Sequence, residues 1–184
     1  MRALKVLIAS DAHVPDRERE IPKEIREFLA SEAPFDLVLY AGDLTGPEVL
    51  EWLKGLGEEV KAVRGNMDYL PLPEEALVEL DGVKALVVHG HQVRPRGNLD
   101  ALSAMALSRG ARVIVHGHLH KPLIKEHKGV LHLNPGSVTG TWGGSSLGGD
   151  PTFMIVRPSK GALEVDLYAL KGGRLERSSY SLRI

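Results

Sequence analysis

Four short apolar runs constrain the fold of this chain more than any other feature. They are rich in Val, Leu and Ile, they lack polar alternation, and each is only seven or eight residues long. Such runs are typical of strands that are buried on both faces. They cover residues 4–10, 36–42, 83–90 and 111–117.

Helical spacing follows three of these strands. Residues 21–33 place Ile21, Ile25 and Leu29 on one face, and an early proline costs little there because the first helical N–H groups lack partners anyway. Residues 46–57 and 98–110 repeat the pattern and stop at glycine. After residue 130 the pattern changes to strands and turns. We therefore expect two sheets packed face to face with helices outside them.

Length and composition narrow the class of protein. A chain of 184 residues suits a single domain, which we expect to cover residues 1–184. A net charge of −1 argues against a general nucleic-acid or membrane-surface binder, and the absence of an 18-residue apolar run argues against a membrane-spanning helix. The first residues read as a strand rather than a signal peptide, which predicts a cytoplasmic protein.

There is no cysteine, so any metal must be held by His, Asp, Glu, Asn or backbone groups.

Residue types that commonly bind metals occur directly after the predicted strands. In a mostly parallel sheet the carboxyl ends of the strands lie along one edge, so these side chains should meet there. Two residues separated by one intervening residue should point to the same side of an extended backbone. The candidates are Asp11, His13, Asp43, Asn66, His89, His91, His118 and His120.

Not every histidine among these motifs is expected to bind a metal. His116 lies further back within its strand, so we leave it out. We expect His91 to support another ligand or to be buried and hydrogen-bonded. A glycine precedes Asp43, Asn66 and His118, and we expect these glycines to allow the required turn and a close approach of an ion.

The remaining set mixes carboxylate, amide and imidazole donors. Such a set suits Mn, Fe, Co, Ni or Zn better than Mg or Ca, which prefer oxygen ligands alone. Seven ligands are too many for one tetrahedral ion, but they suit two ions about 3.5–4 Å apart that share a carboxylate.

In this order along the chain, five motifs resemble those of the calcineurin-like metallophosphoesterases. The motifs are Asp-x-His (11–13), Gly-Asp (42–43), Gly-Asn (65–66), His-Gly-His (89–91) and Gly-His-x-His (117–120). Within that superfamily the chain is most similar to the small prokaryotic YfcE-like phosphodiesterases, and it also resembles the retromer scaffold subunit of the same fold. The resemblance covers nearly the whole chain. It implies an α/β fold, a four-layer α/β/β/α sandwich in which two packed mixed β-sheets are flanked by helices.

The resemblance also implies a role for each motif residue. Two divalent ions, Mn²⁺ first and Ni²⁺, Co²⁺, Fe²⁺ or Zn²⁺ as alternatives, would bind, and a metal-bound hydroxide would attack the phosphorus of a small phosphodiester. Asn66 and His89 are expected to act in catalysis as well as in metal binding. A homo-oligomer, dimer or tetramer, is expected from similar proteins. The implied metal ligands are Asp11, His13 and His120 for one ion, Asn66, His89 and His118 for the other, and Asp43 between them.

One residue departs from the family pattern. Many relatives have histidine after Gly-Asn and are thought to use it to protonate the leaving group, whereas this chain has Met67. A thioether cannot donate a proton, so we expect activated aryl diesters to be better substrates than alkyl monoesters.

Two other functions stay open on the sequence. A non-catalytic scaffold that mediates protein–protein interaction is the main alternative, although it would not need the complete ligand set. A phosphomonoesterase or nuclease is weaker, because of Met67 and because no basic groove is evident.

Overall fold

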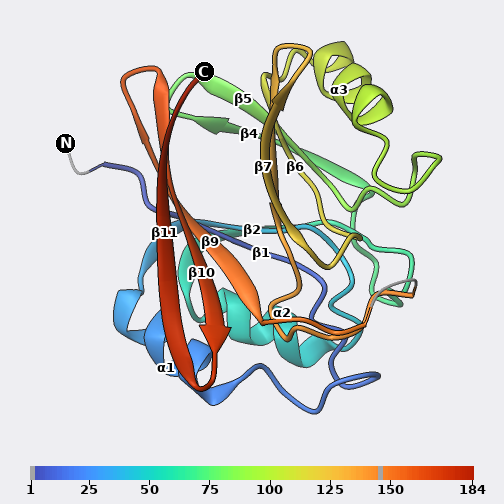
Figure 1. The fold of residues 1–184 in the computed structure, drawn as a ribbon, viewed down its shortest axis with the longest axis vertical. Coiled ribbons are helices and arrows are strands. Elements are labelled where there is room, and N and C mark those ends of the chain that lie inside the picture. The colour runs from blue at the N-terminus through green and yellow to red at the C-terminus, as the bar shows by residue number, and fades with distance from the viewer. Residues whose placement is uncertain (1–2, 145–146) are drawn as a thin grey trace.

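Two β-sheets packed face to face form the centre of the molecule, and helices cover the outer side of each (Figure 1). The computed structural model describes residues 3–144 and 147–184. The glycine-rich segment 139–151 contains Ser145 and Ser146, which lie outside the described residues. The predicted pair of mixed sheets flanked by helices is confirmed.

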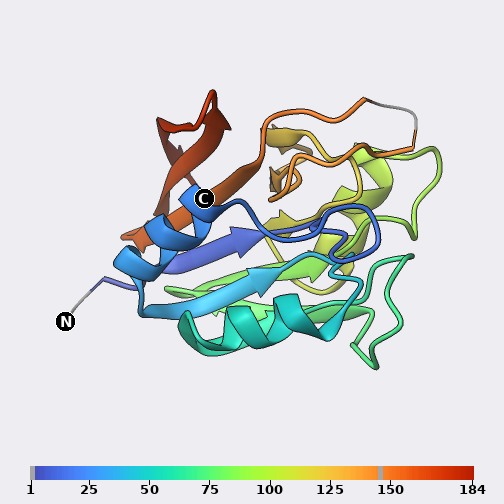
Figure 2. The same cartoon turned by 90° about the horizontal axis from the view of Figure 1, so that it is seen from below.

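The first sheet has six strands in the order β11-β10-β9-β1-β2-β3. β1, β2 and β3 run parallel, and β9 joins β1 in the antiparallel direction. The carboxyl ends of β1 and β2 therefore point to the same side, as the blue and light-blue arrows of Figure 2 show. The strands are β1 (Val6–Ala9), β2 (Phe35–Tyr40), β3 (Gly57–Ala62), β9 (Thr152–Ser159), β10 (Ala162–Lys171) and β11 (Arg174–Arg183).

The second sheet has five strands in the order β4-β5-β6-β8-β7. β5, β6 and β8 are parallel, and the two outer strands are antiparallel to their neighbours. The sequence analysis did not predict β4, whose alternating Ala76, Val78 and Leu80 pack toward the other sheet. The strands are β4 (Glu75–Leu80), β5 (Val83–Val88), β6 (Val113–Val115), β7 (Pro122–His127) and β8 (Val130–Pro135).

Three helices appear where amphipathic spacing predicted them. α1 (Lys23–Glu32) and α2 (Pro47–Lys54) pack on the first sheet, and α3 (Leu99–Ser108) packs on the second. α3 begins where the Asn98 side chain accepts a hydrogen bond from the N–H of Ala101, a favourable N-cap. Among the described residues, no helix is long and apolar enough to cross a membrane.

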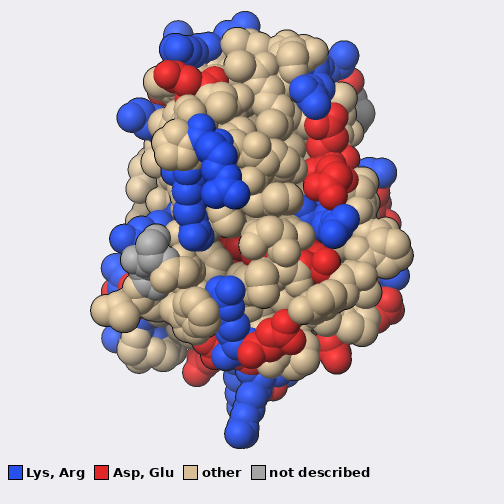
Figure 3. All heavy atoms as spheres, turned by 90° about the vertical axis from the view of Figure 1, so that its right-hand side faces the viewer, with Lys and Arg blue, Asp and Glu red and all other residues tan. Residues whose placement is uncertain are grey.

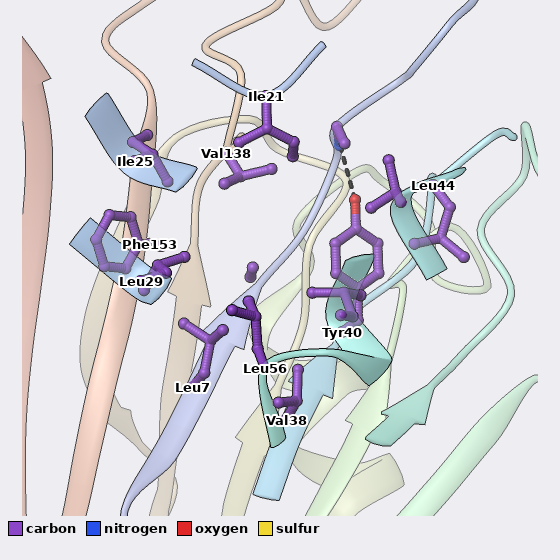
Figure 4. Close-up of a cluster of buried hydrophobic side chains, with 14 of the residues drawn as sticks. Leu7, Ile21, Ile25, Leu29, Val38, Tyr40, Leu44, Leu56, Val138 and Phe153 are labelled. Atoms are coloured by element: carbon purple, nitrogen blue, oxygen red, sulfur yellow. Dashed lines mark hydrogen bonds between the residues drawn. The ribbon is translucent and has the colours of Figure 1, made fainter. Parts of the chain in front are cut away.

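Three hydrophobic clusters hold these layers together. One lies between the sheets, one beneath α1 and α2, and one beneath α3. In the cluster beneath α1 and α2, the Tyr40 ring is fully buried and its hydroxyl accepts a hydrogen bond of 2.9 Å from the N–H of Ala12 (Figure 4). The core therefore fixes the loop that follows β1, and this loop carries two of the predicted metal ligands.

Candidate metal centre

The predicted ligands meet where the parallel strands of both sheets end. Asp11, His13, Asp43 and Asn66 follow β1, β2 and β3 of the first sheet, whereas His89, His118 and His120 follow β5 and β6 of the second. The expectation that they line one edge of one sheet is wrong in this respect. Because the two sheets pack face to face with these ends together, the two edges contribute to one site.

Their donor atoms form two groups that share Asp43. In each group the imidazole nitrogens and carboxylate oxygens lie within 4.8 Å of one another. Asp43 Oδ2 is 3.3 Å from His13 Nε2 and 3.1 Å from His89 Nε2, so one carboxylate faces both groups. Among the described residues, the groups are Asp11, His13, Asp43 and His120, and Asp43, His89 and His118.

Asn66 extends the second group. Its Oδ1 lies 3.0 Å from His89 Nε2, and Asn66 lines the same cavity as Asp43 and His118. The structure thus brings together all seven residues that the sequence analysis selected.

The backbone that delivers these side chains is not extended. Asp11 and His13 have φ values of 54° and 50°, and His118 and His120 have φ values of 70° and 59°. Asp43 is left-handed as well, at 58°. The expectation that alternate residues of an extended segment share a side is therefore wrong, and a left-handed turn at each residue brings the pairs together. Non-glycine residues rarely adopt this conformation, and those that do cluster at functional sites.

Asp11 keeps one oxygen free of protein hydrogen bonds. Its Oδ2 accepts from Ser10 Oγ at 2.6 Å and from the N–H of His118 at 2.9 Å. Its Oδ1 is buried without a hydrogen-bond partner in the described structure, 3.3 Å from His120 Nε2. A buried carboxylate oxygen without a donor is costly unless a cation fills that role.

A buried acid, Asp68, fixes the turn that carries Asp43. The carboxylate of Asp68 accepts backbone N–H bonds from Asp43 at 2.9 Å, Thr45 at 2.9 Å and Gly65 at 2.8 Å. It therefore ties the turn that carries Asp43 to the backbone at Gly65. Burial raises the pKa of Asp68 in spite of these bonds.

Two histidines are oriented by backbone carbonyls. His89 Nδ1 lies 2.7 Å from the Ala41 oxygen, and His120 Nδ1 lies 2.9 Å from the Thr141 oxygen. Donation from Nδ1 directs each Nε2 atom toward the centre, which is the usual arrangement of metal-binding histidines. Burial lowers the pKa of His13 and His118 to about 4, so both rings are neutral at pH 7 and able to bind a cation.

Glycines allow the loops to pack this closely. A Cβ atom on Gly65 would lie 2.1 Å from Asp43 Oδ1, and one on Gly117 would lie 2.1 Å from Ser10 Oγ. Only Gly42, at φ 88°, has the left-handed conformation that was expected of the glycines before the ligands. At Gly65 and Gly117 the requirement is space rather than backbone freedom.

The other histidines lie outside the two groups. His116 is buried and contacts His132 and Asn134, as expected of a residue within the strand. His91 is partly exposed, with its Nε2 3.8 Å from Glu74 Oε2.

The segment after β8 supports the site through Ser137 Oγ, which donates to the Asp11 carbonyl oxygen at 2.7 Å.

A cavity of about 130 Å³ opens over the donor atoms. It faces the side of the molecule to which the parallel strands point, where Lys and Arg side chains lie close to a small acidic patch (Figure 3). The sequence analysis missed Arg17 in its lining, because a charged loop residue carries no local signal of its position. The lining residues are His13, Arg17, Asp43, Asn66, Met67, Arg96, His118, His120, Gly143 and Gly144.

The residues present fit divalent metal ions. They supply imidazole nitrogens, two carboxylates and an amide oxygen, a donor set that suits transition metals. The Oδ1 atom of Asp11 lacks a protein donor that would account for its burial, and Asp43 Oδ2 faces a histidine nitrogen of each donor group.

Comparisons of the sequence identify a family and similar proteins. Residues 4–161 match the family model of the calcineurin-like phosphoesterase superfamily domain. A probable metallophosphoesterase of Methanocaldococcus jannaschii is 40% identical over 132 residues, which are 72% of this chain and 67% of that protein. Another, from Methanothermobacter thermautotrophicus, is 35% identical over 163 residues, 87% of this chain and 89% of that protein.

Solved structures of Vps29 share the whole fold. A single mutant of the Entamoeba histolytica protein superposes with a TM-score of 0.92 at 31% identity, covering 98% of this chain and 100% of that one. The wild-type protein complexed with Zn²⁺ gives a TM-score of 0.90 at 31% identity, covering 97% and 99%.

Proposed function

This chain belongs to the calcineurin-like phosphoesterase superfamily, and from that membership and the geometry of its metal centre we propose that it is a phosphodiesterase dependent on two divalent metal ions. Residues 1–184 form one metallophosphoesterase domain in this proposal. The observation that carries it is the position of Asp43 Oδ2, within 3.3 Å of a histidine nitrogen from each donor group.

The proposed ligands follow the two groups. Asp43 bridges the two ions, which we propose to be Mn²⁺, with Ni²⁺, Co²⁺, Fe²⁺ or Zn²⁺ as the other candidates. Asp11, His13 and His120 bind one ion, and Asn66, His89 and His118 bind the other.

When bound, such a pair of cations lowers the pKa of a water molecule toward neutrality and offsets charge on the phosphoryl oxygens. The chain's own residues orient the reactants. Asn66 lines the cavity and has an amide N–H₂ group that can donate to a phosphoryl oxygen. His89 Nε2 lies 3.0 Å from the Asn66 oxygen, so the two side chains can bind the same ion. These two residues are the proposed catalytic residues.

The proposal favours activated diesters as substrates. Met67 lines the cavity where many relatives have a histidine, and its thioether cannot protonate a leaving group. A p-nitrophenolate leaving group needs no proton, whereas an alkoxide does.

A non-catalytic scaffold is the second candidate. The similarity to Vps29 at 31% identity over 98% of the chain supports it, since a vacuolar protein sorting protein shares the entire fold. Metal binding alone does not separate the two functions, because a wild-type Vps29 has been solved with Zn²⁺.

The deciding experiment is hydrolysis of bis(p-nitrophenyl) phosphate. The protein loaded with Mn²⁺ should release p-nitrophenolate, and Asp43→Ala should abolish this release while elemental analysis records the loss of metal. Asp81→Ala removes a carboxylate at a distant turn and should change neither result. Absence of turnover with each of Mn²⁺, Ni²⁺, Co²⁺ and Zn²⁺ would favour the scaffold.

A further inference from the structure

Two arginines line the cavity of the metal centre without an acidic partner. Arg17 comes from the loop after β1 and Arg96 from the loop between β5 and α3. Neither forms a salt bridge with any carboxylate in the described parts of the chain, whereas Arg109 and Arg157 do. A guanidinium directed into a cavity with no counter-charge is suited to bind an anion there.

Neutral groups hold both arginines in place. Arg17 Nη1 donates to the carbonyl oxygen of Trp142 at 2.8 Å, and its guanidinium carbon lies 4.0 Å from the centre of the Trp142 ring. Arg96 donates to the carbonyl oxygen of His118. These contacts fix the direction of each side chain and leave its charge uncompensated, so the two cations are preorganised.

Each arginine lies near a different half of the metal centre. The backbone N–H of Arg17 donates to the carbonyl oxygen of His13 at 2.9 Å, and the side chain of Arg96 donates to the carbonyl oxygen of His118. The two arginines therefore line the cavity beside ligands of different donor groups.

The metal centre does not need these charges for a simple diester. Two divalent cations more than balance the carboxylates of Asp11 and Asp43, and a phosphodiester carries a single negative charge. Two further fixed cations create an excess that a simple diester leaves unmatched, and a substrate with a second anionic group would use it.

We propose that Arg17 and Arg96 bind a second phosphate group of the substrate, so that the protein acts preferentially on phosphodiesters that carry an additional phosphate. Guanidinium groups bind phosphate oxygens through paired, charge-assisted hydrogen bonds, which favours phosphate over a singly charged substituent. This inference rests on the proposed phosphodiesterase function and names its substrate class.

Two esters with the same leaving group test the inference. The p-nitrophenyl ester of thymidine 5′-phosphate and its 3′-phosphorylated counterpart differ only in the additional phosphate. We expect kcat/KM of the Mn²⁺-loaded protein to be about tenfold or more higher for the phosphorylated ester, the factor expected of one charge-assisted hydrogen bond. Arg17→Gln and Arg96→Gln should each bring the ratio of the two kcat/KM values closer to one.

Matched controls come from neighbouring arginines. Arg19→Gln and Arg94→Gln remove the same charge from positions two residues away, outside the cavity lining of the described chain, and should keep the preference. A wild-type ratio near one, or an equal loss in the control variants, would overturn the inference.

A binding measurement separates this inference from the phosphodiesterase proposal. Calorimetry should show that thymidine 3′,5′-bisphosphate binds the wild-type protein about tenfold more tightly than thymidine 5′-phosphate does, and that Arg17→Gln and Arg96→Gln remove the difference. If neither ester is hydrolysed but this difference is present, the hydrolase proposal fails and the anion site stands. If the two nucleotides bind equally, the anion site fails whatever the activity.

Discussion

Replacing Gly65 with alanine should damage the metal centre while leaving the fold intact. The added Cβ would lie 2.1 Å from Asp43 Oδ1 and 2.4 Å from Asp43 N, whereas ordinary contacts begin near 3.4 Å. Asp43 would have to move by about 1 Å, and its N–H is held by the buried carboxylate of Asp68. Gly65 itself has no left-handed φ, so the effect would come from contact and not from backbone strain.

The expected size of the effect follows from this displacement. Overpacking of this kind costs about 1–3 kcal/mol of unfolding free energy, which a folded domain tolerates. The affinity for Mn²⁺ should fall by about 10–100-fold, because the displaced carboxylate faces both donor groups. A misplacement of about 1 Å should also lower kcat by about 10²-fold.

Calorimetric titration with Mn²⁺, thermal unfolding and turnover of bis(p-nitrophenyl) phosphate measure the three effects. Gly149→Ala is the matched control, since a Cβ there meets nothing within 4 Å and should change none of them. If Gly65→Ala binds Mn²⁺ with wild-type affinity, the close packing at Asp43 is not what shapes the site.

Three other substitutions test separate features. Met67→His should raise turnover of diesters with alkyl leaving groups by about 10²-fold, and no gain in a leaving-group series would reject the role given to this position. Asp68→Asn leaves one of three backbone N–H donors without an acceptor and should cost about 2–4 kcal/mol in urea unfolding; an unchanged midpoint would contradict the network. Burial lowers the pKa of His132 from 6.5 to about 4, so its neutral form stabilises the fold above pH 6.5 and that contribution is lost as the pH falls toward 4. In metal-free protein, lowering the pH from 6.5 to 4 should therefore reduce the unfolding free energy of His132→Gln less than that of the wild type, with a difference of at most ~3 kcal/mol. Parallel curves of unfolding free energy against pH for the two proteins would disprove the assignment.

The strands and helices that enclose the hydrophobic clusters were predictable from the sequence. Runs such as 36–42 are apolar throughout because both faces of β2 are covered, one by α1 and α2 and the other by the second sheet. β4 was not predicted, because the residues on its exposed face interrupt the apolar run. Only the pairing of β4 with β5 identifies it as a strand.

Motif order was enough to select the seven candidate ligands, but not to predict their geometry. The alternate spacing of Asp11 and His13 suggested an extended segment, and spacing alone cannot distinguish that from two left-handed turns. The contribution of the second sheet, the support of Asp43 by Asp68 and the position of Arg17 depend on contacts between segments far apart in the chain. No local pattern encodes such contacts.

The left-handed residues bear on whether the proposed ligands hold metal ions. Five of the seven proposed ligands adopt this conformation without being glycine, at a cost of about 1 kcal/mol or more each. Together these costs approach the whole stability of a typical domain. A protein that used only its outer surface would gain stability from glycine or asparagine at these positions, and nothing in its docking function would oppose the change. Cations that bind only the folded chain offset the strain, because ligand binding adds to the free energy of unfolding. The strained backbone is therefore explained if the five side chains hold metal ions, and this supports metal binding at these residues whichever of the two functions the protein has.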